Sequence, residues 1–291
     1  MKPAPFKYYD PRSLSDAVHL RAKVEDNRTL AGGQSLMPMM NFRYVQPSAI
    51  IDLNRIPELQ GLDISDKTLT FGAMTRQRDI LRDGRMDDAA PIFAEALQHV
   101  GHRQTRARGT IGGSLSHFDP SAELCNLAAL HDATFRLESN SGSRTLTFQE
   151  FGLGYLTTAI RPDEILASIE MRRWPAGHVH AFGEFAFRHG DFALCAVSCL
   201  IHTDRTGTVS ELALCVSGLE PVPVRMTAFE HGAIGTTPDE ALAREAAEAA
   251  GRLDAMSDAY VSGTYRKHLA RTLAFRCVVD ACRKLVQRTE Q

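Results

Sequence analysis

The sequence has few cysteines, and none in the paired spacing that iron–sulfur and zinc centres use. Its six cysteines, at positions 125, 195, 199, 215, 277 and 282, include no Cys-x-x-Cys pair, and most lie within apolar runs. Cysteines in that setting are typical of reduced, buried thiols that behave as small hydrophobic residues. The chain therefore offers no iron–sulfur or zinc ligand set of its own, and we expect no metal site in it.

Strong charge and long apolar runs are also missing, and their absence excludes whole classes of partner. The 33 basic and 35 acidic residues leave a net charge of −2, which does not favour nucleic acid or an anionic membrane. No apolar run approaches the roughly 20 residues that span a bilayer. The first residues, MKPAPFKYYDPRS, lack the apolar core of a secretory signal. We therefore expect a cytoplasmic protein with no nucleic-acid partner and no membrane span.

The sequence does contain two loops of similar construction, each with a pair of adjacent glycines. The first is Ala31–Leu36 (A-G-G-Q-S-L) and the second, about eighty residues further on, is Thr110–Ser114 (T-I-G-G-S). Neither is a Walker P-loop, and neither fits the G-x-G-x-x-G dinucleotide fingerprint. Adjacent glycines let a phosphate approach backbone N–H groups closely. The pair suggests two walls of one elongated phosphate-bearing ligand, with two ordinary tight turns as the alternative.

Polar residues after the second loop offer further candidates. Glu123 precedes an apolar run and can accept hydrogen bonds from sugar or ribityl hydroxyls. His117, Asp119 and Glu123 are spaced like a possible metal cluster, but a proline lies between them and a hydrogen-bonded structural role is favoured. His189 and Asp191 can orient one another, yet no Ser or Cys nucleophile accompanies them. No constellation for hydrolysis or acyl transfer emerges.

The apolar pattern alternates between helical and strand periods, which indicates an α+β protein long enough for two domains. Helices are predicted over residues 13–24, 75–81, 91–100, 124–130 and 264–287, with a further start signal at Thr237-Pro238-Asp239-Glu240. Strands are predicted over residues 28–31, 48–53, 69–74, 131–137, 144–148 and 164–171, and a hairpin over 192–203 and 209–217. The change of composition over 174–183 predicts a domain boundary.

Five short motifs, taken in order, carry a resemblance to one protein family. They are Ala31–Pro38 (A-G-G-Q-S-L-M-P), Ile51–Ile56 (I-D-L-N-R-I), Thr110–Ser114, Asp163–Leu166 (D-E-I-L) and Gly190–Ala193 (G-D-F-A). The set resembles the FAD-binding medium subunits of molybdenum hydroxylases, the group of carbon monoxide dehydrogenase and xanthine dehydrogenase. The resemblance covers essentially the whole chain, and the ordered set is more specific than any single motif.

The resemblance implies an α+β fold of three parts. Residues 1–55 and 56–176 would form the two subdomains of a PCMH-type (vanillyl-alcohol-oxidase-like) domain that holds FAD between them. Residues 177–291 would form a C-terminal α+β domain, a strand meander with helices. No catalytic side chain is implied, since the cofactor carries the chemistry.

The resemblance also implies which residues bind FAD. In this sequence they are Ala31, Gly32, Gly33, Gln34, Ser35 and Leu36 in the first loop, and Thr110, Ile111, Gly112, Gly113 and Ser114 in the second. Glu123 would help to hold the polar chain of the cofactor, and the main chain at Leu166 would contact the flavin ring. Family members often have Asn at Ser114 and Asp at Glu123, changes that keep the polar role. A lysine that some members have near 183–184 is missing here.

The partners implied by the family carry the remaining redox centres. A small subunit with [2Fe–2S] clusters would deliver electrons, and a large molybdopterin-binding subunit would hydroxylate the substrate, together as a dimer of heterotrimers. FAD would accept electrons one at a time and pass them to a quinone, NAD+, oxygen or a carrier protein. Neither the substrate of the complex nor the acceptor is encoded in this chain.

Three other functions fit parts of the sequence. A self-contained PCMH-type flavin oxidoreductase would need a base over the flavin and usually a longer cap domain. A non-catalytic nucleotide-binding assembly subunit would have lost flavin, whereas both Gly-Gly loops are intact. A medium subunit of the benzoyl-CoA reductase type would carry an inserted cysteine-rich loop, and the sequence has no such insert.

Overall fold

The computed structural model describes residues 1–289, which mix helices and strands in two compact units. Unit 1 comprises Met1–Asp83, His102–Phe118 and Asp132–Arg172. Unit 2 comprises Gly84–Gly101, Asp119–His131 and the chain from Arg173 onward. Two internal segments of the first half therefore belong to the same unit as the C-terminal part. The predicted division at residues 55 and 176 stays a prediction.

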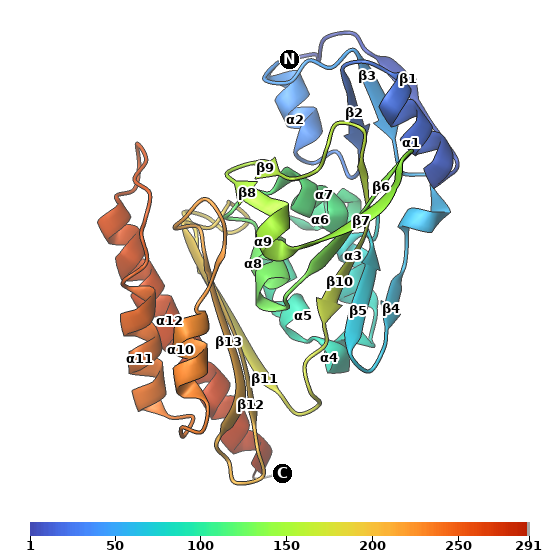
Figure 1. Cartoon of the computed structure of the whole chain (residues 1–291). Helices are drawn as coiled ribbons and strands as arrows, with labels where there is room; N and C mark the ends of the chain where they lie inside the picture. Colours follow the sequence, from blue (N-terminus) through green and yellow to red (C-terminus); the bar gives the residue numbers. More distant parts are fainter. Residues whose placement is uncertain (290–291) are drawn as a thin grey trace. The chain divides into compact units, whose positions relative to one another are not determined.

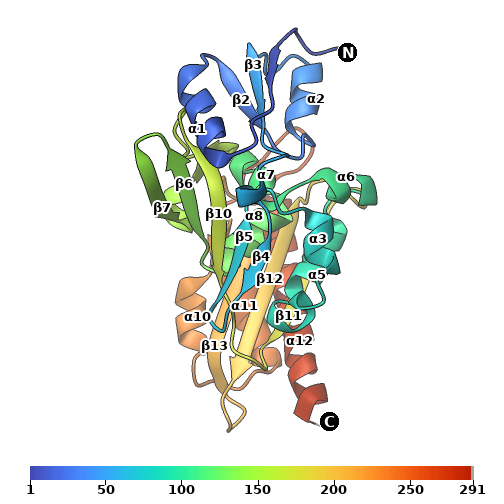
Figure 2. The same ribbon diagram turned by 90° about the vertical axis from the view of Figure 1, so that its right-hand side faces the viewer.

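The N-terminal part of unit 1 is a small parallel sheet between two helices. Its strands β1 (Lys7–Tyr9), β2 (Asn27–Leu30) and β3 (Ala49–Asp52) follow the order β1-β3-β2. Figures 1 and 2 show α1 (Leu14–Lys23) and α2 (Leu36–Asn41) on opposite sides of this sheet. Helix α1 starts as predicted, because the Ser13 side chain accepts a hydrogen bond of 3.1 Å from the Asp16 N–H.

The larger sheet of unit 1 is antiparallel, in the order β4-β5-β10-β6-β7. Its strands are β4 (Leu62–Ile64), β5 (Thr68–Gly72), β6 (Thr134–Ser139), β7 (Gly142–Thr147) and β10 (Ile165–Arg172). Around it lie η1 (Pro57–Leu59), α3 (Gln77–Arg82), α6 (Arg103–Arg108), α7 (Ile111–His117), α9 (Phe148–Phe151) and the ribbon β8 (Gly152–Gly154) with β9 (Thr157–Thr158). Strand β10 contains a bulge between Leu166 and Ser168, in its pairing with β6. A bulge bends its strand and changes the direction of nearby side chains.

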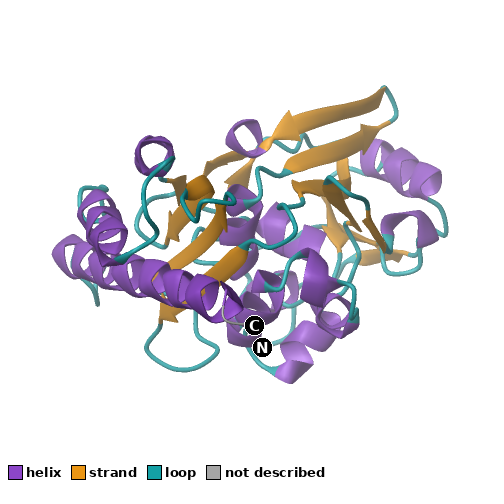
Figure 3. Cartoon of the chain, turned by 90° about the horizontal axis from the view of Figure 1, so that it is seen from below, coloured by secondary structure: helices purple, strands orange, loops and turns teal. Residues whose placement is uncertain are grey.

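Unit 2 is an antiparallel sheet with helices packed against it. The strands β11 (Val179–Phe185), β12 (Cys195–Thr203), β13 (Val209–Ser217) and β14 (Val224–Arg225) pair in that order. The helices are α4 (Met86–Ala89), α5 (Ile92–His99), α8 (Glu123–Leu130), α10 (Thr227–Ala233), α11 (Glu240–Ala250) and α12 (Gly263–Thr289). Figure 3 shows α12 as one long helix beside the strands, and it contacts β11, β12 and α11. None of the helices within residues 1–289 combines the length and apolar character needed to cross a bilayer.

The cysteines are core residues, as their sequence setting predicts. All six are free and buried. Burial raises the pKa of five of these thiols, those of residues 125, 195, 199, 277 and 282. A thiol that stays protonated is a poor nucleophile and a poor metal ligand, so these side chains contribute packing rather than chemistry.

Two local predictions are wrong in informative ways. Helix α11 begins two residues later than the Thr237 signal suggests, because the Asp239 carboxylate accepts the Ala241 and Leu242 N–H groups at 2.8 and 3.2 Å. The second Gly-Gly pair lies inside the first turn of α7 rather than in a loop.

Buried polar contacts fasten α8 to the sheet of unit 2. Asn126, with none of its surface exposed, donates 3.0 Å to the Ser217 hydroxyl and accepts from the Ser198 hydroxyl. At the other end of the helix, Arg225 donates to the carbonyl oxygens of Ala129 and Leu130 at 3.0 and 2.8 Å. These contacts hold the helix that begins with Glu123, a predicted site residue, in one position on the sheet.

Replacing Asn126 with alanine should destabilise unit 2. The change removes the hydrogen-bond partner of two buried hydroxyls, those of Ser198 and Ser217. We expect it to lower the free energy of unfolding by about 1–3 kcal/mol. Urea unfolding followed by circular dichroism measures the loss. Asn140→Ala, at an exposed position in the β6–β7 turn, is the control and should stay within about 0.5 kcal/mol of the parent chain. Equal stability of the two variants would contradict the role given to Asn126.

Candidate functional site

The first Gly-Gly loop connects β2 to α2, and its backbone donors are unpaired. Within residues 1–289, no oxygen accepts a hydrogen bond from the N–H groups of the consecutive residues Gly32 to Ser35. Gly33 adopts a φ of +74°, in the left-handed region, and Ser35 is right-handed. Successive N–H groups in a turn of mixed hand form a concave anion-binding surface, often called a nest. Such a surface is suited to an anionic group.

The second Gly-Gly pair has no free donors of this kind. Its N–H groups from Ile111 to Ser114 donate, in order, to Thr75 O at 3.0 Å, Ala73 O at 2.9 Å, Thr110 Oγ1 at 3.0 Å and Thr110 O at 3.1 Å. The expectation that Gly112 and Gly113 supply backbone N–H donors to a phosphate is therefore wrong. The hydroxyl of Ser114, by contrast, has no partner within the described chain.

What the second pair provides is close packing against the first. A Cβ on Gly113 would lie 3.2 Å from the Ala31 Cβ. A Cβ on Gly32 would overlap the Arg108 carbonyl oxygen and lie 2.8 Å from the Gly109 Cα. The two loops are thus neighbours in unit 1, and the glycines are needed because the backbones nearly touch.

Leu166 belongs to the same neighbourhood through a short series of backbone hydrogen bonds. The Gly112 N–H donates to Ala73 O at 2.9 Å, and the Ala73 N–H donates to Ala167 O, also at 2.9 Å. Ala167 is the extra residue of the β10 bulge. A Cβ on Gly112 would lie 2.5 Å from the Ala73 Cβ, so the α7 turn packs directly on this bridge. Unit 1 therefore brings together every predicted cofactor residue except Glu123.

Glu123 lies in unit 2, at the first position of α8, and is 6% exposed. Burial, and then the nearby Glu184, raises the pKa of its carboxyl to about 8. Close to it, His99 Nδ1 and Glu184 Oε1 are 3.1 Å apart, and this carboxylate raises the pKa of His99. This shift favours the protonated carboxyl of Glu123, which can donate a hydrogen bond as well as accept one.

Within the described residues, no group of three or more His, Cys, Asp and Glu side chains is placed to hold a metal ion. His189 and Asp191 lie in the segment between β11 and β12, and the His189 ring stacks on His99 with 6.4 Å between ring centroids. Neither side chain is itself a Ser or Cys nucleophile, so this pair does not make a hydrolytic site.

Two known domain families match nearly the whole chain. The FAD binding domain in molybdopterin dehydrogenase matches residues 4–174, and the CO dehydrogenase flavoprotein C-terminal domain matches residues 180–281. The chain belongs to the FAD-binding medium subunits of molybdenum hydroxylases. It is the flavoprotein component of a molybdenum-containing oxidoreductase, and its cofactor is FAD. The predicted fold, a PCMH-type FAD domain followed by a C-terminal domain of this family, is confirmed.

Individual relatives show the same similarity over nearly full length. The alpha subunit of the 6-hydroxypseudooxynicotine dehydrogenase complex of Paenarthrobacter nicotinovorans is 34% identical over 97% of this chain and 96% of its own. The carbon monoxide dehydrogenase medium chain of Hydrogenophaga pseudoflava is 33% identical over 86% of each chain. A chain in a solved structure of carbon monoxide dehydrogenase from Hydrogenophaga pseudoflava superimposes with a TM-score of 0.92, at 31% identity, over 98% of this chain and 99% of that one.

The residues of unit 1 fit the cofactor of this medium-subunit family. A diphosphate needs several converging donors, and the unpaired N–H groups of Gly32 to Ser35 are such a set. The Ser35 side chain makes no capping hydrogen bond to α2.

Sequence reasoning missed two residues that hold the first loop in place. Asn54 belongs to one of the family motifs but received no role, and Arg76 was not considered at all. Both bond to the backbone around the two loops. The available signal was the position of Asn54 two residues after the buried strand β3, in a connecting segment of the kind that often carries functional side chains.

The chain should lose stability with rising pH because of Glu123. Between its ordinary carboxyl pKa of 4.5 and its folded value of about 8, the unfolded chain releases this proton while the folded chain keeps it. A rise in pH across that window therefore favours unfolding, by up to about 1.4 kcal/mol per pH unit. Glu123→Gln removes the effect. Urea unfolding of both cofactor-free proteins between about pH 5 and pH 8 measures it, and parallel pH curves would show that Glu123 ionises normally.

Proposed function

We propose that this chain is the FAD-carrying electron-transfer subunit of a heteromeric molybdenum hydroxylase. It receives electrons from [2Fe–2S] clusters of a small partner subunit and passes them to an external acceptor, while a large molybdopterin-binding subunit hydroxylates the substrate. The observation that carries the proposal is the nest of unpaired N–H groups from Gly32 to Ser35, packed against the segment that leads into Thr110–Ser114. Family membership supports the division of labour between subunits.

The residues named from the sequence then take separate parts in binding. The nest holds the diphosphate, with the Ser35 and Ser114 hydroxyls as further donors. Thr110 keeps the α7 turn closed by capping Gly113, so that the backbone can pass close to the ligand. The main chain at Leu166 contacts the flavin ring, and the protonated Glu123 carboxyl donates to an oxygen of the polar chain. The remaining predicted residues belong to the same two motifs: Ala31, Gln34, Leu36 and Ile111.

Bound FAD supplies a redox group, which the surrounding side chains lack. The chain itself binds and orients that group and keeps water from it. No pair of thiols takes part, since the cysteines are buried and their protonated form is favoured by burial. The names of the relatives, a medium chain and a subunit of a dehydrogenase complex, agree with a chain that works within a larger assembly. We propose a dimer of heterotrimers for that assembly.

Absorbance spectra of the purified chain, alone and with its partner subunits, test the proposed function. We expect flavin bands that correspond to about one FAD per chain, and [2Fe–2S] bands only when the small subunit is present. Substrate should reduce the flavin in the complete complex but not in a complex that lacks the small subunit. Iron–sulfur bands from this chain alone, or substrate oxidation by this chain alone, would overturn the proposal.

Gly33→Ala should weaken FAD binding by about tenfold or more. A left-handed backbone costs an alanine roughly 1–2 kcal/mol, and its Cβ would lie 3.3 Å from the Leu30 and Met37 side chains, so the nest or these neighbours must move slightly. Gly207→Ala is the matched control, since Gly207 has a φ of +84° in the β12–β13 turn with open space around it. Titration with FAD, followed by flavin fluorescence, measures both. The nest assignment fails if the two variants bind FAD equally well.

A further inference from the structure

Two side chains of unit 1 join the separate segments that meet at the first Gly-Gly loop. Asn54 Nδ2 donates to the Ala31 carbonyl oxygen at 2.9 Å, directly before the nest. Asn54 Oδ1 accepts from Arg76 Nη2, and Arg76 Nη1 donates to the Arg108 carbonyl oxygen. The Arg108 carbonyl is the group that a Cβ on Gly32 would overlap. We call these two side chains the Asn54–Arg76 clamp.

The clamp is itself held in place from both ends. Asp52, the last residue of β3, accepts from the Asn54 backbone N–H at 2.9 Å and from its side chain at 2.5 Å. The Tyr8 hydroxyl donates to the same carboxylate at 2.5 Å. On the other side, the backbone of Arg76 forms an isolated antiparallel bridge with Thr110. The clamp therefore connects the small parallel sheet to the first residue of the second Gly-Gly motif.

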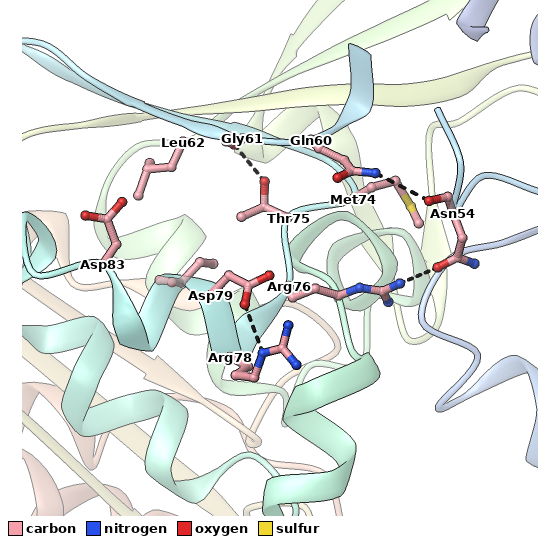
Figure 4. A pocket seen from close by; sticks show the side chains of 11 residues that line it. Asn54, Gln60, Gly61, Leu62, Met74, Thr75, Arg76, Arg78, Asp79 and Asp83 are labelled. Carbon is pink, nitrogen blue, oxygen red and sulfur yellow. Dashed lines mark hydrogen bonds and ion pairs between the residues drawn. The ribbon is translucent and has the colours of Figure 1, made fainter. Parts of the chain in front are cut away.

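A cavity of about 440 Å³ borders the clamp on the side of β4 and α3. Figure 4 shows Arg76 extended toward Asn54 along the wall of this cavity. Arg78, two residues further on, takes a different course and pairs with its neighbour Asp79 at 2.9 Å. Of these two arginines, only Arg76 bonds to the backbone beside the first Gly-Gly loop.

We propose that Asn54 and Arg76 are positioning residues for FAD binding, which act by holding the Gly32–Ser35 nest against the segment before Thr110. The inference rests on the proposed function, in which that nest binds the diphosphate. The nest is not held in shape by hydrogen bonds from its own N–H groups, since these have no acceptor within the described residues. Holding the loop in its binding shape before the ligand arrives lowers the entropy lost on binding. The forked guanidinium suits this task, because it bonds to Asn54 and to Arg108 at once.

Arg76→Lys in the full-length chain is the sharpest test of the clamp. Lysine keeps the charge but has a single head group that cannot reproduce the fork between Asn54 Oδ1 and Arg108 O. We expect FAD affinity to fall tenfold or more, while the melting temperature of the cofactor-free chain changes little. Arg78→Lys, the same substitution at the exposed neighbour, should bind FAD like the parent. Asn54→Ala should lower the FAD affinity by a similar factor, and it serves as a second variant.

A double-mutant cycle with Gly33→Ala separates positioning from a general loss of structure. If the clamp acts through the nest, Arg76→Lys should cost much less FAD affinity in the Gly33→Ala background than in the parent. Fully additive effects, or parent-like FAD affinity of both Arg76→Lys and Asn54→Ala, would overturn the clamp proposal and leave the proposed function intact. A parent chain that binds no FAD would instead overturn the proposed function.

Discussion

The unpaired backbone donors of the first Gly-Gly loop set the main constraint on unit 1. Buried or half-buried N–H groups without acceptors cost free energy, so a chain that keeps several in a row must hold them with other contacts. Here the neighbours of Gly32–Ser35 supply those contacts: Asn54 bonds to the carbonyl before the loop, and the Arg108–Gly109 backbone packs directly against Gly32. These contacts join the loop to two other segments of unit 1.

The two Gly-Gly pairs look alike in sequence but have different structural roles. In the first pair the backbone N–H groups have no acceptor within the described residues. In the second pair the N–H groups bond to acceptors within the chain, and the lack of side chains lets the backbone approach Ala31 and Ala73 closely. The same Ala73 bonds to the β10 bulge, which places Leu166 beside the second pair. One bridge residue thus brings three distant parts of the sequence together.

Unit 2 contributes a different kind of group. Glu123 starts α8, and Asn126 and Arg225 fasten that helix to the sheet through buried hydrogen bonds. Burial raises the pKa of the Glu123 carboxyl to about 8 and so favours its protonated form. A protonated carboxyl can donate a hydrogen bond as well as accept one.

The sequence by itself determined what depends on near neighbours. The α+β pattern, the start of α1 at Ser13, the hairpin of β12 and β13 and both glycine pairs follow from periodicity, capping and turn chemistry, and an ordered set of motifs identified the family. Only the tertiary structure decided which glycine pair keeps free donors, that Asp239 rather than Thr237 caps α11, that Asn54 and Arg76 connect Ala31 to Arg108, and that burial raises the pKa of Glu123. Most of these properties depend on atoms that are far apart in the chain. The α11 cap depends on which of two competing local signals the folded backbone satisfies. No local sequence pattern specifies the distant contacts or the choice between the two caps.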